Sequence, residues 1–322
     1  MEKTAEFIKN DKDILKIYGT IEVWEIKNWL KVFHESSNIN IHYEREYVYK
    51  NPPIMAKRIL DEIGNNEQSA DVVLSAVSPQ MKMLDLFIPY VSDNRNNIPV
   101  DFMDDLGYWT SVLLLPTIQI FNPNELDSNQ IPKTINDFGH EFLKDKISLH
   151  DPTYGSFGGQ WLSSIRTIIG DDDWHHLLSN LSLLRPRKFP LFIDIINDVS
   201  NGNSSVGLTV MLYEYLREKQ SKKNIERLII SDLPILLSST AVSLVKYSKN
   251  TNLAKKFIDF LLSSECQNMI GNTDIRIPAS DRTDSKYSLQ NLIPEEKFVF
   301  FPSAETFNRA ASDAIYYQKI FP

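Results

Sequence analysis

The chain has 322 residues, of which 42% are hydrophobic and 24% are charged, and its formal net charge is −8 at pH 7. A chain of this length and apolar content can form two lobes, each with its own core. The acidic balance argues against a general nucleic-acid-binding protein, which needs a basic surface for the phosphate backbone. Cys266 is the single cysteine, which excludes an intrachain disulfide and a thiolate metal cluster.

The N-terminal residues and the overall hydropathy bear on location. The sequence contains no apolar run of about 18 residues, and residues 1–19 lack the apolar stretch of a signal peptide. Two alternatives stay open on these residues alone. The protein is cytoplasmic, or it is exported and its signal is not in this sequence.

Hydrophobic patterning predicts an α/β fold for the first third of the chain. Residues 13–20 and 38–45 alternate like strands, and the segment 21–36 between them has a helical apolar face. Such a β-α-β unit is almost always right-handed, with parallel strands. A helix is predicted over 54–64 and a buried strand over 70–76. Ligand-binding loops are expected at the carboxyl ends of these strands.

The rest of the chain continues in the same style. Residues 107–123 form a long apolar segment interrupted by Pro116, which predicts that a strand bends or changes partners there. The further expected elements are helices over 134–143, 161–169, 171–184, 190–202, 213–220 and 251–271, strands over 146–150 and 204–212, and paired strands over 233–250.

Several stretches, in their order along the chain, resemble one family of proteins. They are "ADVVLSA" (70–76), "GYWTSVLLLPTIQIFNP" (107–123), the segment 131–162 that contains "DPTYGSFGGQW", "SSVGLTV" (204–210) and "NLAKKFIDFLLSSECQ" (252–267). This order is similar to that of the type 2 periplasmic solute-binding proteins of ABC importers. The nearest branch has ferric-ion-, polyamine-, thiamine- and organophosphate-binding members.

The resemblance implies a two-lobed α/β fold of the type 2 periplasmic-binding class, with a ligand cleft between the lobes. Lobe one is expected to comprise residues 1–115 and 236–322, and lobe two residues 116–235. A member of this family is periplasmic or extracellular and works with a membrane permease. We therefore expect a monomer that binds a small solute, uses no cofactor and is not an enzyme. No G-x-S-x-G, Walker or H-E-x-x-H motif argues otherwise.

The turn "DPTYGSFGG" is the main candidate for an anion site. Thr153, Tyr154, Gly155 and Ser156 lie between a predicted strand and a predicted helix N-terminus, where unpaired N–H groups and the helix dipole favour an anion. The alternative is that Ser156 only caps the helix. In the family that this segment resembles, the same loop contacts anionic ligands, which favours the anion site, with Tyr154 as a wall.

The residues after "VGL" (206–208) bear on whether the solute is ferric iron. Ferric-ion members of the branch carry two adjacent tyrosines there, whereas this chain has Leu212 and Tyr213 at those positions. A shift by one residue makes Tyr213 and Glu214 an oxygen pair, so iron stays an alternative. Tyr213 and Glu214 are ligand candidates in either case, and they are the metal candidates if the solute is iron.

Small hydroxyl-bearing loops complete the predicted site. Thr20 follows the first predicted strand, Ser75 and Ala76 end the strand at 70–76, and Ser239 lies where the family has a further cleft loop. Such donors suit phosphate or sugar oxygens better than a bare trivalent cation. The prediction is a solute-binding protein that captures a phosphorylated or phosphonate-type anion by lobe closure. The alternatives are a ferric-ion-binding protein and the sensing domain of a signalling system.

Arg276 in "TDIRIPAS" is a further candidate, because this family often returns to the cleft region near that point. A structural salt bridge is the equally weighted alternative for this residue.

Overall fold

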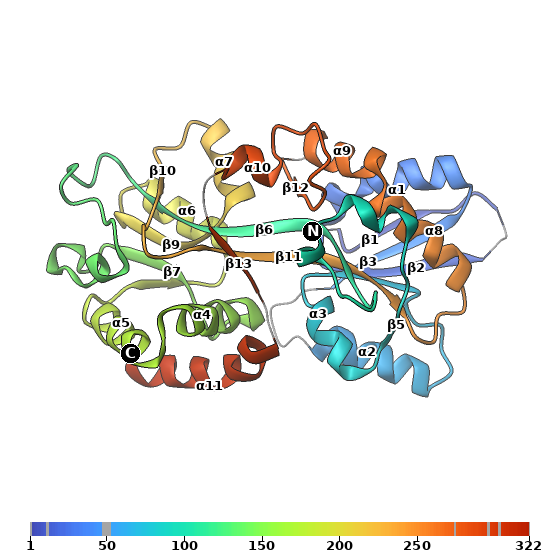
Figure 1. Ribbon diagram of the computed structural model, residues 1–322, viewed down its shortest axis with the longest axis horizontal. Coiled ribbons are helices and arrows are strands. Elements are labelled where there is room, and N and C mark those ends of the chain that lie inside the picture. The colour runs from blue at the N-terminus through green and yellow to red at the C-terminus, as the bar shows by residue number, and fades with distance from the viewer. Residues whose placement is uncertain are drawn as a thin grey trace. The chain divides into compact units, whose positions relative to one another are not determined.

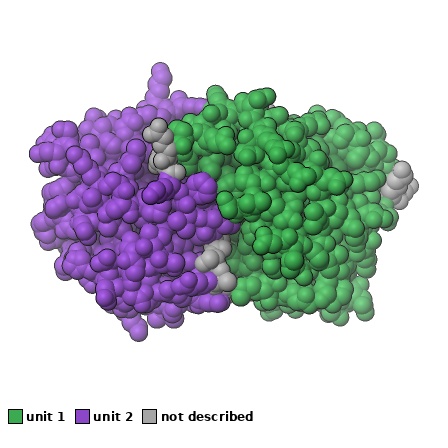
Figure 2. Space-filling model, viewed as in Figure 1, with its two compact units in different colours: residues 1–114, 239–294 green, residues 115–238, 295–322 purple. Residues whose placement is uncertain are grey.

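The computed structural model describes residues 2–10, 13–46, 53–273, 275–294, 297–301 and 304–321. The chain divides into two compact units (Figure 2). Unit 1 comprises Met1–Leu114 and Ser239–Pro294, and unit 2 comprises Leu115–Ser238 and Glu295–Pro322. Two long strands, β6 (Thr110–Phe121) and β11 (Ile235–Val245), carry the chain from one unit to the other.

The division differs from the expected lobes mainly at the C-terminus. The crossings in β6 and β11 lie within three residues of the expected boundaries, but the chain changes unit a third time after Pro294, so residues 295–322 belong to unit 2 and not to the lobe that holds the N-terminus. The cause is the packing of α11 (Ala304–Ile320) against α4 (Gly155–Ile169). Asp313 on α11 accepts a hydrogen bond from the Ser163 hydroxyl at 2.5 Å and pairs with Arg166 at 2.6 Å, both on α4.

Unit 1 is built on three parallel strands in the order β3-β2-β4. β1 pairs antiparallel with β3 at one edge, and β11 pairs antiparallel with β4 at the other. Helices α2 and α3 cover one face of this sheet and α1 lies on the other, where it packs against β1 and β3 (Figure 1). The elements of unit 1 are β1 (Thr4–Phe7), β2 (Ile14–Gly19), α1 (Val23–Ser37), β3 (Asn40–Arg45), α2 (Pro53–Gly64), β4 (Val72–Ser75), α3 (Ser78–Met81), β5 (Phe87–Ile88), α8 (Thr251–Leu262), α9 (Ser264–Thr273), β12 (Ile277–Pro278), α10 (Leu289–Leu292), and 3-10 turns at Lys82–Leu84, Asp93–Asn97 and Val100–Phe102.

Unit 2 also has three parallel strands, in the order β8-β7-β9. β6 pairs antiparallel with β9, and β10 pairs antiparallel with β6. Helices α4, α5 and α11 lie on one side of the sheet and α6 and α7 on the other (Figure 1). The remaining elements of unit 2 are β7 (Ile147–His150), α5 (Asp171–Leu183), β8 (Arg187–Phe189), α6 (Phe192–Ser200), β9 (Val206–Met211), α7 (Leu212–Gln220), β10 (Glu226–Leu228), β13 (Phe298–Phe300), and 3-10 turns at Ile135–Gly139 and Glu141–Leu143.

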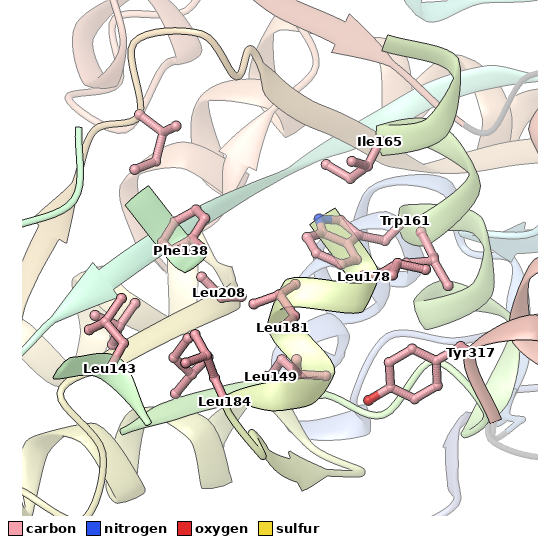
Figure 3. Packing of buried hydrophobic residues seen from close by; sticks show 14 of the residues in the cluster. Phe138, Leu143, Leu149, Trp161, Ile165, Leu178, Leu181, Leu184, Leu208 and Tyr317 are labelled. Atoms are coloured by element: carbon pink, nitrogen blue, oxygen red, sulfur yellow. The ribbon is translucent and has the colours of Figure 1, made fainter. Parts of the chain in front are cut away.

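The core of unit 2 forms where α4, α5 and α11 pack on the sheet. Trp161 and Ile165 of α4, Leu178 of α5, Leu149 of β7 and Tyr317 of α11 belong to one buried cluster (Figure 3). The helical spacing of the apolar residues after the turn at 151–156 therefore does place them in the core. This cluster fixes the start of α4 against the sheet, which positions the candidate anion turn.

The predicted α/β fold class is confirmed, and most predicted elements are present. Pro116 lies where β6 changes partners, from β12 at Leu113–Leu114 to β9 from Thr117 onward. Three predictions are wrong in detail. Residues 134–143 form two 3-10 turns, residues 235–245 form one strand and not a pair, and the predicted helix at 251–271 is two helices.

None of the helices in the described part of the chain is long and apolar enough to span a bilayer.

Candidate functional site

Three helices of unit 2 begin at one edge of the sheet, the edge where its parallel strands end. α4 follows β7, α6 follows β8 and α7 follows β9, so the three helices begin at the same edge. Their N-cap residues are Tyr154, Leu191 and Met211, and none of these side chains accepts a capping hydrogen bond. The first N–H groups of a helix have no partner inside the helix. This edge therefore presents backbone donors and the positive ends of three helix dipoles, an arrangement that suits an anion.

The turn before α4 is organised by its own carboxylate. Asp151 Oδ1 accepts hydrogen bonds from the Thr153 backbone N–H at 2.9 Å and from the Thr153 hydroxyl at 2.7 Å. The Tyr154 N–H donates to the Asp151 carbonyl at 3.0 Å. The structure thus uses the predicted Thr153 donors inside the turn. An anion at this edge would meet the N–H groups of α4 rather than the Thr153 side chain.

Gly155 and Ser156 are the first two residues of α4, and their side-chain surroundings lie outside the described part of the structure. Because Tyr154 is the N-cap residue, Ser156 lies inside the first helical turn and not at the cap position. The alternative that Ser156 is the helix cap therefore does not match the observed helix boundary. The Tyr154 side chain is exposed, and its role as a wall for a bound solute stays a prediction.

The two glycines that follow have a packing role. A Cβ atom on Gly158 would lie 2.6 Å from Pro152 Cα and 2.8 Å from the Asp151 carbonyl oxygen, and one on Gly159 would lie 3.0 Å from the Ala310 carbonyl oxygen. Contacts under 3.0 Å with backbone require a shift of the chain. The glycines thus allow α4 to start directly against the turn on one side and against α11 on the other.

His150 lies at the candidate site, and the sequence reasoning did not single it out. It ends β7, is 3% exposed, and lies between the ring of Phe192 at the start of α6 (4.6 Å) and the ring of Phe157 in α4 (5.9 Å). Its backbone N–H donates to Thr209 Oγ1 of β9 at 2.7 Å. Burial lowers the pKa of His150 to about 4, so the imidazole is neutral at pH 7. One buried side chain therefore contacts two of the helix starts and is tied to the strand before the third.

Tyr213 and Glu214 lie in the first turn of α7, at the same edge of unit 2. The Tyr213 hydroxyl donates to Glu214 Oε1 at 3.1 Å, and the Arg217 guanidinium lies 5.7 Å from the centre of the Tyr213 ring. Tyr215 points away into the core and is 8% exposed. Among the described residues, no group of three or more His, Cys, Asp and Glu side chains is arranged to hold a metal ion.

In unit 1, the carboxyl edge of β2 and β4 brings together Thr20 and Ala76. The Thr20 N–H donates to the Leu74 carbonyl at 3.1 Å, and the Ala76 N–H lies 3.4 Å from Thr20 Oγ1. Ser75 and Ser239 are buried at this edge. Ser75 Oγ accepts from the Val77 N–H at 3.2 Å, and Ser239 Oγ accepts from the Ser111 hydroxyl at 2.7 Å. Thr20 and Ala76 are thus the more accessible of these four predicted residues.

The loop that carries Thr20 is anchored from the neighbouring strand β3. The Tyr43 hydroxyl donates to the Ile21 carbonyl at 2.6 Å, and Arg45 Nη2 lies 2.5 Å from Glu22 Oε1. Gly19 permits this arrangement, because a Cβ atom there would lie 2.6 Å from the Tyr43 ring. Sequence reasoning treated residues 38–45 only as a strand. The available signal was a charged residue at the carboxyl end of a predicted parallel strand.

Arg276 forms a buried ion pair with Glu25 of α1. Glu25 is 2% exposed and Arg276 is 7% exposed. Of the two alternatives for Arg276, the structure therefore has the salt bridge.

Comparison with known proteins identifies a family to which the chain belongs. A family model described as a bacterial extracellular solute-binding protein matches residues 67–309. Among curated protein sequences, none matches the chain significantly.

Solved structures similar to this chain agree in fold. A substrate-binding protein of an ABC transporter from Agrobacterium tumefaciens has a TM-score of 0.81 and 13% identity, over 99% of this chain and 98% of that one. The ferric-binding protein from Campylobacter jejuni has a TM-score of 0.77 and 18% identity, over 95% and 99%. The periplasmic binding protein AfuA from Actinobacillus pleuropneumoniae, solved with exogenous fructose-6-phosphate bound, has a TM-score of 0.74 and 21% identity, over 95% of each chain.

Proposed function

The chain belongs to the bacterial extracellular solute-binding proteins, and we propose that it is the substrate-binding component of an ABC importer that captures a small anionic solute. The solute class is a phosphorylated or phosphonate-type organic anion. The protein then acts as a periplasmic or extracellular monomer that delivers its solute to a membrane permease, without a cofactor and without catalysis. Relatives of the same fold include an ABC transporter component and a protein with bound fructose-6-phosphate, which supports this reading.

The main support for an anionic solute is the edge of unit 2 at which α4, α6 and α7 begin without side-chain caps. An oxyanion accepts several backbone N–H groups at once in such a place, and it needs no lysine or arginine. Within unit 1, Thr20 and Ala76 present a hydroxyl and a backbone edge that suit the same class of solute. A ligand with differential affinity for the closed state would drive closure of the two lobes.

Iron is the second candidate, and Tyr213 with Glu214 supports it. Their oxygens lie 3.1 Å apart on adjacent residues, and phenolate and carboxylate oxygens are hard ligands. A ferric-binding protein shares the fold. Against iron, the first tyrosine of the ferric pair is replaced by the buried Leu212.

Thermal unfolding with a panel of solutes tests the proposal. The panel contains fructose 6-phosphate, a simple phosphonate, thiamine phosphate, spermidine and ferric citrate, with fructose as the neutral counterpart. Binding of the native state alone raises Tm by mass action, so about 100 Kd of ligand stabilises by about 2.7 kcal/mol. We expect a phosphorylated or phosphonate compound to raise Tm while fructose does not.

Introducing a negative charge distinguishes the anionic solute from ferric iron. Ala76→Asp places a carboxylate beside Thr20, which repels an anionic solute and favours a cation. The matched control is Asn66→Asp, which adds the same charge at an exposed position of unit 1. We expect Ala76→Asp to weaken binding of the anion about tenfold, a change in the range measured for close charge pairs. Asn66→Asp is expected to leave the affinity unchanged. Tighter ferric binding in Ala76→Asp, with no loss for any anion, would replace the organic anion by iron.

A further inference from the structure

Arg45 is a buried cation at the solute edge of unit 1. It is the last residue of β3 and lies opposite Gly19, the last residue of β2, in a parallel register. The carboxyl ends of parallel strands share one edge, so Arg45 stands beside the loop that carries Thr20. Its side chain is only 5% exposed. A guanidinium at this depth requires a compensating anion.

Glu22 supplies that anion. Its Oε1 lies 2.5 Å from Arg45 Nη2. Glu22 is also the N-cap residue of α1, yet its side chain makes no capping hydrogen bond to its own helix. The carboxylate is therefore directed to Arg45 and not to the nearby N–H groups. With 25% of its side chain exposed, Glu22 is the partner with access to solvent.

A second glutamate of α1 also pairs with an arginine, and that pair shows what a purely structural ion pair looks like. Glu25 is one turn further along α1, and it pairs with Arg276. Both side chains are less than 10% exposed, at 2% and 8%. Neither partner of that pair has access to solvent. The Arg45–Glu22 pair differs because its anion can move into water.

We propose that Arg45 is a specificity-determining residue for the anionic solute and that Glu22 is an internal substitute for the solute's charged group. This rests on the proposed function. In the unliganded protein Glu22 neutralises Arg45. When a phosphate, phosphonate or carboxylate arrives beside Thr20, it takes over the guanidinium, and Glu22 turns to solvent.

The exchange explains how a buried arginine can select for charge. The planar guanidinium binds two oxygens of a phosphate or carboxylate at once, so an anionic group replaces Glu22 with a similar geometry. A neutral solute offers no such replacement, and it would have to bind with the internal pair intact. Selectivity then comes from the competition between two anions, at the expense of some affinity for the correct solute.

The test compares Glu22→Gln with Glu35→Gln, which removes the same charge from the exposed end of α1 (63% exposed side chain). Calorimetric titration measures Kd for fructose 6-phosphate, inorganic phosphate and fructose in each variant. Without its competitor, Arg45 is expected to bind the two phosphate probes about tenfold more tightly in Glu22→Gln, as for a close charge pair. Fructose is expected to give no measurable binding in any variant, and Glu35→Gln is expected to keep the Kd values of the parent chain for the two phosphate probes.

Two further variants keep the inference testable if Glu22→Gln folds poorly. Glu22→Asp retains the charge but shortens its reach, and we expect a smaller gain of phosphate affinity in the same direction. In Arg45→Gln the phosphate affinity falls, and in the double variant Glu22→Gln/Arg45→Gln the gain disappears. Equal Kd values for Glu22→Gln and Glu35→Gln, in a protein that binds phosphate probes, overturn the inference alone. Failure of all variants and of the parent chain to bind any anionic probe overturns the proposed function, and the inference with it.

Discussion

Lowering the pH from 7 to 4.5 is expected to destabilise the fold through one buried imidazole, that of His150. Burial lowers the pKa of His150 from 6.5 to about 4. The unfolded chain accepts a proton near pH 6.5, whereas the folded chain does not until about pH 4. The unfolded state therefore binds more protons in this window, and stability falls as the pH falls.

The size of the effect follows from the two pKa values. They differ by about 2.5, and each unit corresponds to about 1.4 kcal/mol, so about 3 kcal/mol is present above pH 6.5 and lost by pH 4. This value applies because His150 is enclosed by Phe157 and Phe192 and not by solvent.

Urea unfolding at a series of pH values between 7 and 4.5 measures the loss of stability that protonation of His150 causes. His150→Gln removes the titration, so its free energy of unfolding should depend less steeply on pH than that of the parent chain, by about 2 to 3 kcal/mol across the series. Carboxylates titrate in both proteins and cancel in the difference. The control is His176→Gln, at an exposed position of α5. Parallel curves for His150→Gln and the parent chain would refute the reasoning.

Three further outcomes are expected. Gly158→Ala should lower the free energy of unfolding by about 1 to 3 kcal/mol, because its Cβ meets backbone at 2.6 Å, whereas Gly64→Ala, with open space, should cost nothing in the same denaturation assay. Arg276→Met should cost about 3 to 5 kcal/mol by removing the guanidinium that neutralises the buried Glu25 carboxylate, and adding Glu25→Gln should recover part of it; no recovery contradicts the ion-pair argument. Burial raises the pKa of the Cys266 thiol, so a thiol reagent should label it only as fast as the protein unfolds, and rapid labelling of folded protein would contradict that.

The sequence was informative where local patterning decides structure. Alternation predicted β2 and β3, helical spacing predicted α1 and α2, and a continuous apolar run predicted β4, which is buried at every residue. The turn at 151–156 was located correctly between a strand and a helix, because its composition marks a turn.

The missed elements depend on contacts that are distant in sequence or on small capping groups. The helix predicted over 251–271 breaks at Ser263, whose backbone is extended and whose hydroxyl accepts from the Cys266 N–H at 3.2 Å. Residues 233–250 were expected to form a pair of strands, but β11 is one strand and every residue of it is buried. A fully buried strand tolerates small hydroxyl residues when they find partners, as Ser239 does on Ser111.

The candidate site shows the same limit. Thr153 was predicted as a donor to a ligand, but Asp151 accepts both of its hydrogen bonds. His150 and Arg45 became visible only with the strand register and the rings or carboxylate that enclose them. Residue type and spacing located the edges of the sheets, and the three-dimensional packing then determined which side chains stand there.

Calorimetric titration of the unmodified protein with a phosphorylated sugar, its unphosphorylated counterpart and ferric citrate tests the central claim most directly. The account predicts saturable binding of the phosphorylated or a related phosphonate compound, no heat from the neutral sugar, and affinity that weakens as salt is raised. Saturable binding of ferric ion alone, with a coloured tyrosinate complex and no response to any organic anion, would contradict it.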